Sequence, residues 1–205
     1  MSQISRDFRQ RNQSRRPKVF GCAVAIAVVS VLVVQAVTSV REANKRSHAE
    51  LERSRQKWRL VTVESVRNGR TQAGVSDVLL LEMLANDPQC VDTITSVWFH
   101  MADLVDPRFG RLREFKNAKE IGFYDCENAD NIIDIAKEMD TVESLYFEVT
   151  RISPQSRQNL AQFRNLKKVH FEQIVDDGVI DELNKLLPNV NVEAPYPASK
   201  EPSIR

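Results

Sequence analysis

Four segments of this chain repeat the same apolar pattern at a spacing of 24 residues. Three columns of apolar residues result: Ile94, Ala118, Val142, Leu166; Val97, Ile121, Leu145, Val169; and Phe99, Phe123, Phe147, Phe171. With 42% hydrophobic residues in the chain, a random sequence would fill all these positions with apolar residues about 3 times in 100,000. A period in this range is typical of solenoids whose units each contribute one strand and one return segment.

Each predicted strand is followed by a turn signal and by apolar residues at helical spacing. The turn signals are Asp106-Pro107, Asn128, Ser153-Pro154 and Asp176-Asp177-Gly178. A side-chain oxygen at the N-cap accepts a hydrogen bond from an otherwise unpaired N–H, and proline at the first helical position has no N–H to satisfy. The sequence therefore predicts that each unit is a strand, a turn and a short helix.

This pattern resembles the leucine-rich repeat family over residues 94–192. The frame apolar-x-x-apolar-x-Phe stands where the family has L-x-x-L-x-L, and VDDGVIDEL at 175–183 is similar to a bacterial return segment, T-D-x-G-L-x-x-L. Phe replaces Leu, and the Asn that many members place after the strand is missing. The resemblance implies an α/β fold, a short leucine-rich-repeat solenoid of parallel strands and short convex helices over residues 94–193. Val190 and Val192 suggest a truncated fifth strand.

A segment without charges, residues 19–40, precedes the repeats. As a helix it would be about 33 Å long, enough for the ~30 Å hydrocarbon layer. The sequence therefore predicts one transmembrane helix, a single-pass signal anchor, although a cleaved signal peptide is the open alternative. The basic tail, residues 1–18, is expected on the cytoplasmic side, which would make the repeat domain extracytoplasmic.

The segments around the repeats are predicted from composition. Residues 41–58 form a helical stalk, and Leu51 and Trp58 with Ala49 are too few for a coiled-coil seam. Residues 59–93 form an N-terminal cap with a strand through Val61, Val63 and Val66, and with a helix from Val78 to Leu84 that Ser76 caps. Residues 194–205 are expected to be a flexible C-terminal tail.

Charge and motifs exclude several classes of function. The chain has 29 basic and 28 acidic residues, so no bulk charge recruits nucleic acid. It lacks a phosphate-binding loop, paired cysteines and the common hydrolase motifs. His100 and His170 are too far apart in the predicted sheet to share a metal ion. We therefore expect no enzyme, no catalytic residue, no cofactor and no metal site.

The outward columns of the strands are the candidate binding face. Because strand side chains alternate, residues beside the buried columns point away from the core. Two such columns contain Trp98, Gly122, Tyr146, His170 and His100, Tyr124, Glu148, Glu172. Gly122 is predicted to leave a gap between Trp98 and Tyr146 that receives a peptide side chain or a sugar. The simpler alternative is that the aromatic residues only cover a pleated surface.

These features together predict a non-enzymatic, membrane-anchored protein-interaction module. Its partner would be a protein, a peptide or an envelope polymer that binds the concave face of the repeats. The alternative is a structural or assembly component of a membrane complex that works through its span and stalk. The oligomeric state is left open.

Overall fold

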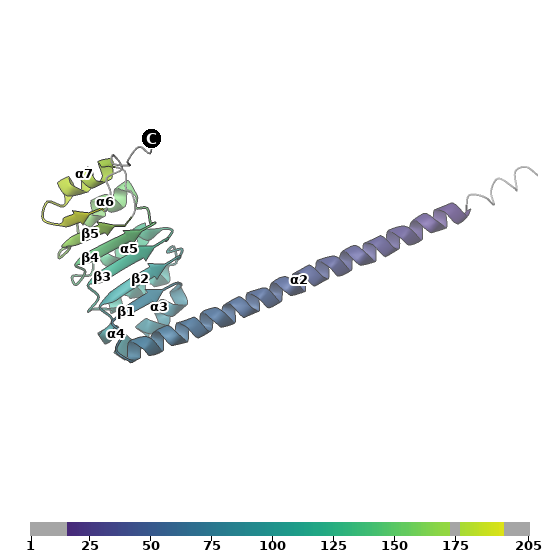
Figure 1. Ribbon diagram of the computed structural model, residues 1–205, viewed down its shortest axis with the longest axis horizontal. Coiled ribbons are helices and arrows are strands. Elements are labelled where there is room, and N and C mark those ends of the chain that lie inside the picture. Colours follow the sequence, from purple (N-terminus) through teal and green to yellow (C-terminus); the bar gives the residue numbers. More distant parts are fainter. Residues whose placement is uncertain (1–15, 173–176, 195–205) are drawn as a thin grey trace, which may run out of the picture. The chain divides into compact units, whose positions relative to one another are not determined.

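The computed structural model describes the backbone of residues 16–172 and 177–194, and the side chains of residues 35–172 and 178–194. The chain divides into two compact units, Met1–Gln56 and Lys57–Arg205. Helix α2 (Arg16–Arg67) contributes to both units (Figure 1). Most of the predicted basic tail and of the predicted C-terminal tail lies outside the described residues, as does Asp176 of the predicted turn Asp176-Asp177-Gly178.

The structure contradicts the predicted transmembrane helix 19–40. Within the described part of the chain, no helix is both long and apolar enough to cross a membrane. The described side chains of α2 are charged in nearly every turn from Arg41 onward, and charged side chains are costly in the hydrocarbon layer. The side chains of residues 19–34 lie outside the description. The same finding contradicts three predictions that depended on this helix: the single-pass membrane location, the signal anchor and the extracytoplasmic repeat domain.

Six strands of the described residues form one parallel sheet in the order of the sequence (Figure 1). They are β1 (Gln72–Val75), β2 (Ser96–His100), β3 (Glu120–Tyr124), β4 (Ser144–Glu148), β5 (Lys168–Phe171) and β6 (Asn191–Glu193). Paired residues are 24 positions apart from Gln72↔Ser96 through Ser144↔Lys168. The last pair, Lys168↔Asn191, is 23 positions apart. The sequence period is thus the period of the sheet.

The four phenylalanines stack directly over one another, as the sequence predicts. Phe99, Phe123, Phe147 and Phe171 are register partners, with ring centroids 5.8, 5.1 and 5.2 Å apart. None of the four is more than 3% exposed. Val75 takes the same position in β1, opposite Phe99. This column is the centre of the hydrophobic core.

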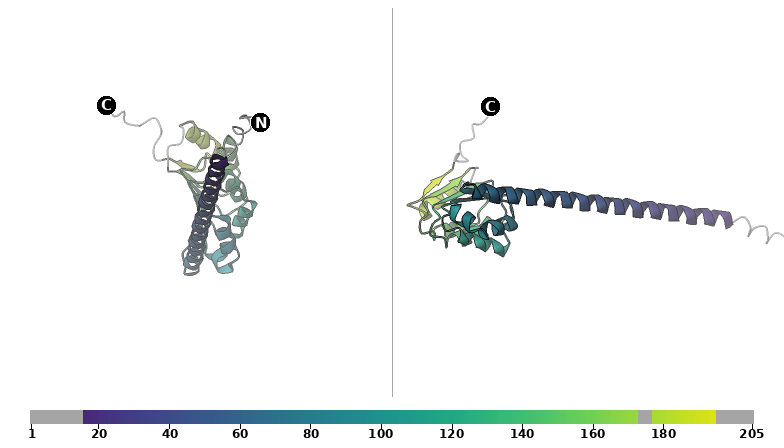
Figure 2. Two further views of the ribbon diagram at one scale, coloured as in Figure 1. Left: turned by 90° about the vertical axis from the view of Figure 1, so that its right-hand side faces the viewer. Right: turned by 90° about the horizontal axis from the view of Figure 1, so that it is seen from below.

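Short helices connect the strands and lie along one face of the sheet (Figure 2). They are α3 (Val78–Ala85), α4 (Pro88–Thr93), η1 (Pro107–Glu114, a 3-10 helix), α5 (Ala129–Ala136), α6 (Pro154–Leu160) and α7 (Asp177–Leu186). Asp106 and Ser153 cap their helices as predicted, and Phe109 of η1 meets Phe99 edge to face at 5.7 Å. Asn128 differs, because it has a left-handed backbone (φ 56°) and its side chain makes no capping bond.

The predicted N-terminal cap is only partly correct. Val61, Val63 and Val66 belong to helix α2, not to a strand, because nothing interrupts the helix before Gly69 at φ 96°. Val63 and Val66 lie three residues apart on one helical face, and both are buried. Helix α3 is capped by Asp77, whose carboxylate accepts from the N–H of Leu80, and not by Ser76. The strand of this region is β1, which the sequence reading missed.

Candidate binding face

We use the name binding face for the eight predicted residues on the outward side of β2 to β5: Trp98, His100, Gly122, Tyr124, Tyr146, Glu148, His170 and Glu172. Trp98↔Gly122↔Tyr146↔His170 are register partners along one column, and His100↔Tyr124↔Glu148 along the next. Most of these side chains are partly exposed, whereas Gly122 is buried and Glu172 is exposed. The sheet therefore brings the predicted residues together on one surface.

The gap predicted at Gly122 does not exist. The indole ring of Trp98 lies over Gly122 so closely that a Cβ at this position would be 2.4 Å from the ring. Across Gly122 the indole stacks on Tyr146, with ring centroids 5.4 Å apart and an angle of 28° between the planes. The ring that was expected to border a pocket fills it instead.

Trp98 also contacts two residues of its own strand, β2. Its indole N–H donates to the hydroxyl of Ser96 at 2.9 Å, and its ring lies 6.4 Å from that of His100. The His100 ring in turn lies over Gly74, where a Cβ would approach it to 3.4 Å. Gly74 was not predicted, although it stands 24 residues before Trp98 and is paired with it in the sheet. Two glycines thus make room for the two rings.

The aromatic side chains form a continuous ladder across the sheet. Besides the Trp98 contacts, His100 and Tyr124 lie 5.9 Å apart, and Tyr146 and His170 lie 5.8 Å apart. Burial lowers the pKa of His100, which favours its neutral form. Aromatic pairs in such offset and tilted arrangements contribute about 0.5–1.5 kcal/mol beyond their buried area. The ladder is therefore a packed aromatic strip whose side chains are partly exposed.

A basic and an acidic residue close one end of the ladder. Lys168 Nζ lies 2.8 Å from Glu193 Oε2 and 5.6 Å from the centre of the Tyr146 ring. His170 Nδ1 lies 3.1 Å from the same carboxylate. The hydrogen bond from Lys168, followed by that of His170, lowers the pKa of Glu193. The sequence reading missed Glu193, which pairs with His170 in the sheet.

Two carboxylates, Glu148 at the end of β4 and Glu172 directly after β5, give the binding face an acidic edge. The pKa of Glu148 is raised, first by partial burial and then by the adjacent Glu172. Among the described residues, no lysine, arginine or histidine forms an ion pair with either carboxylate, in contrast to Glu193. The edge formed by Glu148 and Glu172 is thus negative and uncompensated within the described part.

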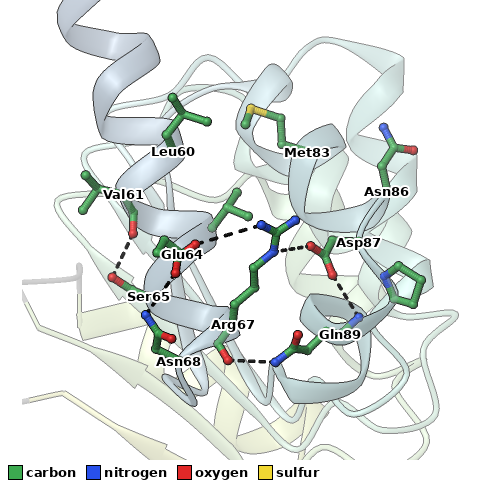
Figure 3. A pocket seen from close by; sticks show the side chains of 12 residues that line it. Leu60, Val61, Glu64, Ser65, Arg67, Asn68, Met83, Asn86, Asp87 and Gln89 are labelled. Carbon is green, nitrogen blue, oxygen red and sulfur yellow. Dashed lines mark hydrogen bonds and ion pairs between the residues drawn. The ribbon is translucent and has the colours of Figure 1, made fainter.

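An open groove of about 1190 Å³, whose lining includes no residue of the binding face, lies within the unit Lys57–Arg205 (Figure 3). It is bordered by the last turns of α2 and by α3 and α4, with Leu60, Val61 and Met83 on its apolar side. Arg67 Nε donates to Asp87 at 2.7 Å, and the Gln89 amide donates to the carbonyl of Arg67 at 2.8 Å. Its polar groups therefore pair with one another and bind α2 to the following helices.

Metal chemistry finds no support in the described side chains, because they contain no group of three or more His, Cys, Asp or Glu that could hold an ion. Neither the protein-family models nor the curated proteins compared with this chain give a match. The function of the chain is therefore inferred from the geometry of the binding face.

Proposed function

We propose that this chain is a non-enzymatic interaction module of the leucine-rich repeat type, which binds a protein or peptide segment across its binding face. The membrane anchor is no part of this proposal. The alternative of a structural component in a membrane complex depended on the predicted span and is dropped with it. The observation that carries the proposal is the aromatic ladder, which is partly exposed and lies beside an uncompensated acidic edge.

The ladder has the properties of an interface anchor. Trp and Tyr provide most of the binding free energy in many interfaces, because they bury a large area and lose little conformational entropy. Gly122 and the Ser96 hydroxyl already fix the indole of Trp98. A partner would therefore meet a preorganised surface, which lowers the entropy cost of binding.

The acidic edge indicates the chemistry of the partner. An uncompensated carboxylate pair favours a lysine or arginine side chain, and the ring of Tyr124, the register partner of Glu148, favours the same cation. A partner cation would also lower the raised pKa of Glu148. We therefore expect an extended segment in which a basic residue follows apolar or aromatic residues.

The experiment is a selection of random peptides on the purified full-length chain, followed by titration of single synthetic peptides. Selected peptides should contain Lys or Arg. Replacing Trp98→Ala and Tyr146→Ala together should weaken their binding by at least about 30-fold, because truncated anchors cost about 2 kcal/mol or more. Replacing Glu148→Gln and Glu172→Gln together should weaken binding by about tenfold and reduce its salt dependence.

Matched controls separate the binding face from general damage. Trp58→Ala removes the other tryptophan, which is 60% exposed, and should leave the affinity for a monovalent peptide unchanged. Glu127→Gln removes one exposed carboxylate outside the binding face and should also have no effect. Selected peptides that bind the Trp98→Ala, Tyr146→Ala chain as tightly as the original chain, while that chain keeps its circular dichroism spectrum, would overturn the proposal.

A further inference from the structure

Helix α2 contains a long stretch that no described part of the chain covers. Every residue from Gln35 to Trp58 is exposed. Helices of this kind are marginal in water without a packing partner, because most helical stability in proteins comes from an apolar face that is buried. A partner for this face would account for a helix that continues without interruption through the segment.

The exposed apolar residues of this helix follow a heptad. Its a and d positions are Val37, Val40, Asn44, Ser47, Leu51, Ser54, Trp58, Val61 and Ser65, which we call the seam. Among the described side chains of α2, the large exposed apolar ones are Val37, Val40, Leu51, Trp58, Leu60 and Val61. All of them except Leu60 lie on the seam.

The charged residues avoid the seam completely. Between positions 41 and 67 there are twelve Asp, Glu, Lys and Arg residues, and none of them occupies an a or d position. Leu51, Trp58 and Ala49 alone are too few apolar residues to predict a coiled coil. Ala49 lies off the seam, and the uncharged Asn and Ser positions complete it. A period of 3.5 residues is that of a left-handed coiled coil.

We propose that the seam packs against the same seam of a second copy of this chain, as a parallel, in-register two-stranded coiled coil. In this arrangement each g position faces the e position five residues later on the other helix. Glu50 at g then faces Arg55 at e, and no like charges oppose each other. In an antiparallel pair e faces e, which would place Arg41 near Arg55 of the other copy. Arg55 already holds an ion pair with Glu52 of its own helix at 2.8 Å. It can therefore bridge this carboxylate and that of Glu50 on the other copy.

A polar residue supports the same register. Asn at a single a position favours a parallel dimer, because the two amides hydrogen-bond only when they face each other. Asn44 takes this position. Ser47 and Ser54 at d contribute little apolar area, so the apolar seam residues would supply most of the binding free energy: Val37, Val40, Leu51, Trp58 and Val61. The dimer would present two binding faces, and its avidity for a repeated partner would exceed that of one face.

Sedimentation equilibrium of the full chain tests the association. We expect a mass of twice 23.4 kDa at micromolar concentration. Leu51→Lys with Trp58→Lys should raise the dissociation constant at least about 100-fold, because both charges would be buried in the seam. Leu60→Lys is the matched control, since Leu60 is 56% exposed but lies off the seam, and it should remain dimeric. A monomeric original chain, a higher oligomer, or seam and control variants that associate alike would overturn the proposal.

Disulfide cross-linking tests orientation and register in the same full chain. In a parallel, in-register pair, the Ser47→Cys chain carries two thiols in contact across the seam and should cross-link rapidly under mild oxidation. Glu52→Cys places the thiol at a b position and should cross-link no faster than the original chain, which controls for the native cysteines. A dimer in which Ser47→Cys cross-links no faster than Glu52→Cys would overturn the parallel arrangement.

Discussion

The indole of Trp98 and the backbone of Gly122 are in direct contact, since a Cβ on Gly122 would approach the ring to 2.4 Å. The two residues are register partners on neighbouring strands, 24 positions apart in the sequence. Because glycine has no side chain, the ring can lie across β3 and reach Tyr146 on β4. The packing of the whole aromatic ladder depends on this single small residue.

Replacing Gly122→Ala should therefore displace Trp98. The new methyl group overlaps the ring, so we expect a red shift of tryptophan fluorescence and a loss of about 1–3 kcal/mol in the free energy of unfolding, as in other overpacked sites. Urea unfolding followed by fluorescence measures both. Gly110→Ala is the control, because its Cβ would meet only the flexible end of Arg113 at 3.5 Å. An unchanged spectrum in the Gly122→Ala chain would contradict the observed stacking.

The turns after β2, β3 and β4 store backbone strain. Met101, Asp125 and Val149 directly follow β2, β3 and β4, and all have left-handed backbones, with φ of 47°, 48° and 51°. This conformation is unfavourable for a β-branched residue but is tolerated by Asn and Asp. Val149→Asn should raise the free energy of unfolding by about 1 kcal/mol, measured by urea unfolding. Val105→Asn, also at an exposed valine, should change it by less than about 0.5 kcal/mol. Equal effects of the two substitutions would argue against strain at Val149.

The sequence predicted the core of this fold better than its ends. The phenylalanine column follows from two constraints, alternation along a strand and a constant repeat length, and these leave little freedom. Strand β1 was missed because QAGV offers only Ala73 and Val75 where later repeats have larger residues. The end of α2 was mistaken for a strand because Val61, Val63 and Val66 fit an alternating pattern as well as a helical one. Only burial on one face distinguishes the two.

The binding face was predicted as a set of residues but not as a shape. The repeat places Trp98, Gly122 and Tyr146 in one column, whereas the direction in which the indole leans depends on a rotamer and on the bond to Ser96. Glu193 was not predicted as part of this surface, because the last repeat is one residue shorter. A step of 24 from His170 falls on Ala194 instead. Local side-chain packing and a single deletion thus set the limits of prediction from the sequence.

The acidic edge should make stability depend on pH through Glu148. Its pKa is raised above the ordinary 4.5 by burial and by Glu172. The folded chain therefore binds the proton more tightly than the unfolded chain, and stability is lost progressively as pH rises from the ordinary value through the raised value. Glu148→Gln should thus increase the free energy of unfolding at neutral pH, and this gain should disappear as pH falls below the ordinary value. Urea unfolding at a series of pH values measures it.

A control for this pH dependence is Glu127→Gln, which removes the same charge at an exposed position outside the binding face. Its effect on the free energy of unfolding should not follow the profile of Glu148→Gln. Glu172→Gln should reproduce part of that profile, because it removes the neighbour that raises the Glu148 pKa. A Glu148→Gln chain with a constant stability difference at all pH values would show that folding does not raise the pKa of Glu148.

Truncation of the phenylalanine column should be most costly at its centre. Phe147 is 2% exposed and lies between Phe123 and Phe171, at centroid distances of 5.1 and 5.2 Å. Phe147→Ala would leave a cavity between two stacked rings and should lower the free energy of unfolding by about 3–5 kcal/mol. Phe147→Leu keeps most of the volume and should cost less than about 1.5 kcal/mol. Urea unfolding distinguishes these values, and a Phe147→Ala chain that loses no more than the Phe147→Leu chain would mean that the neighbouring repeats close the cavity. In a stack whose strand spacing is fixed by backbone hydrogen bonds, such closure is restricted, which is why the two variants should differ.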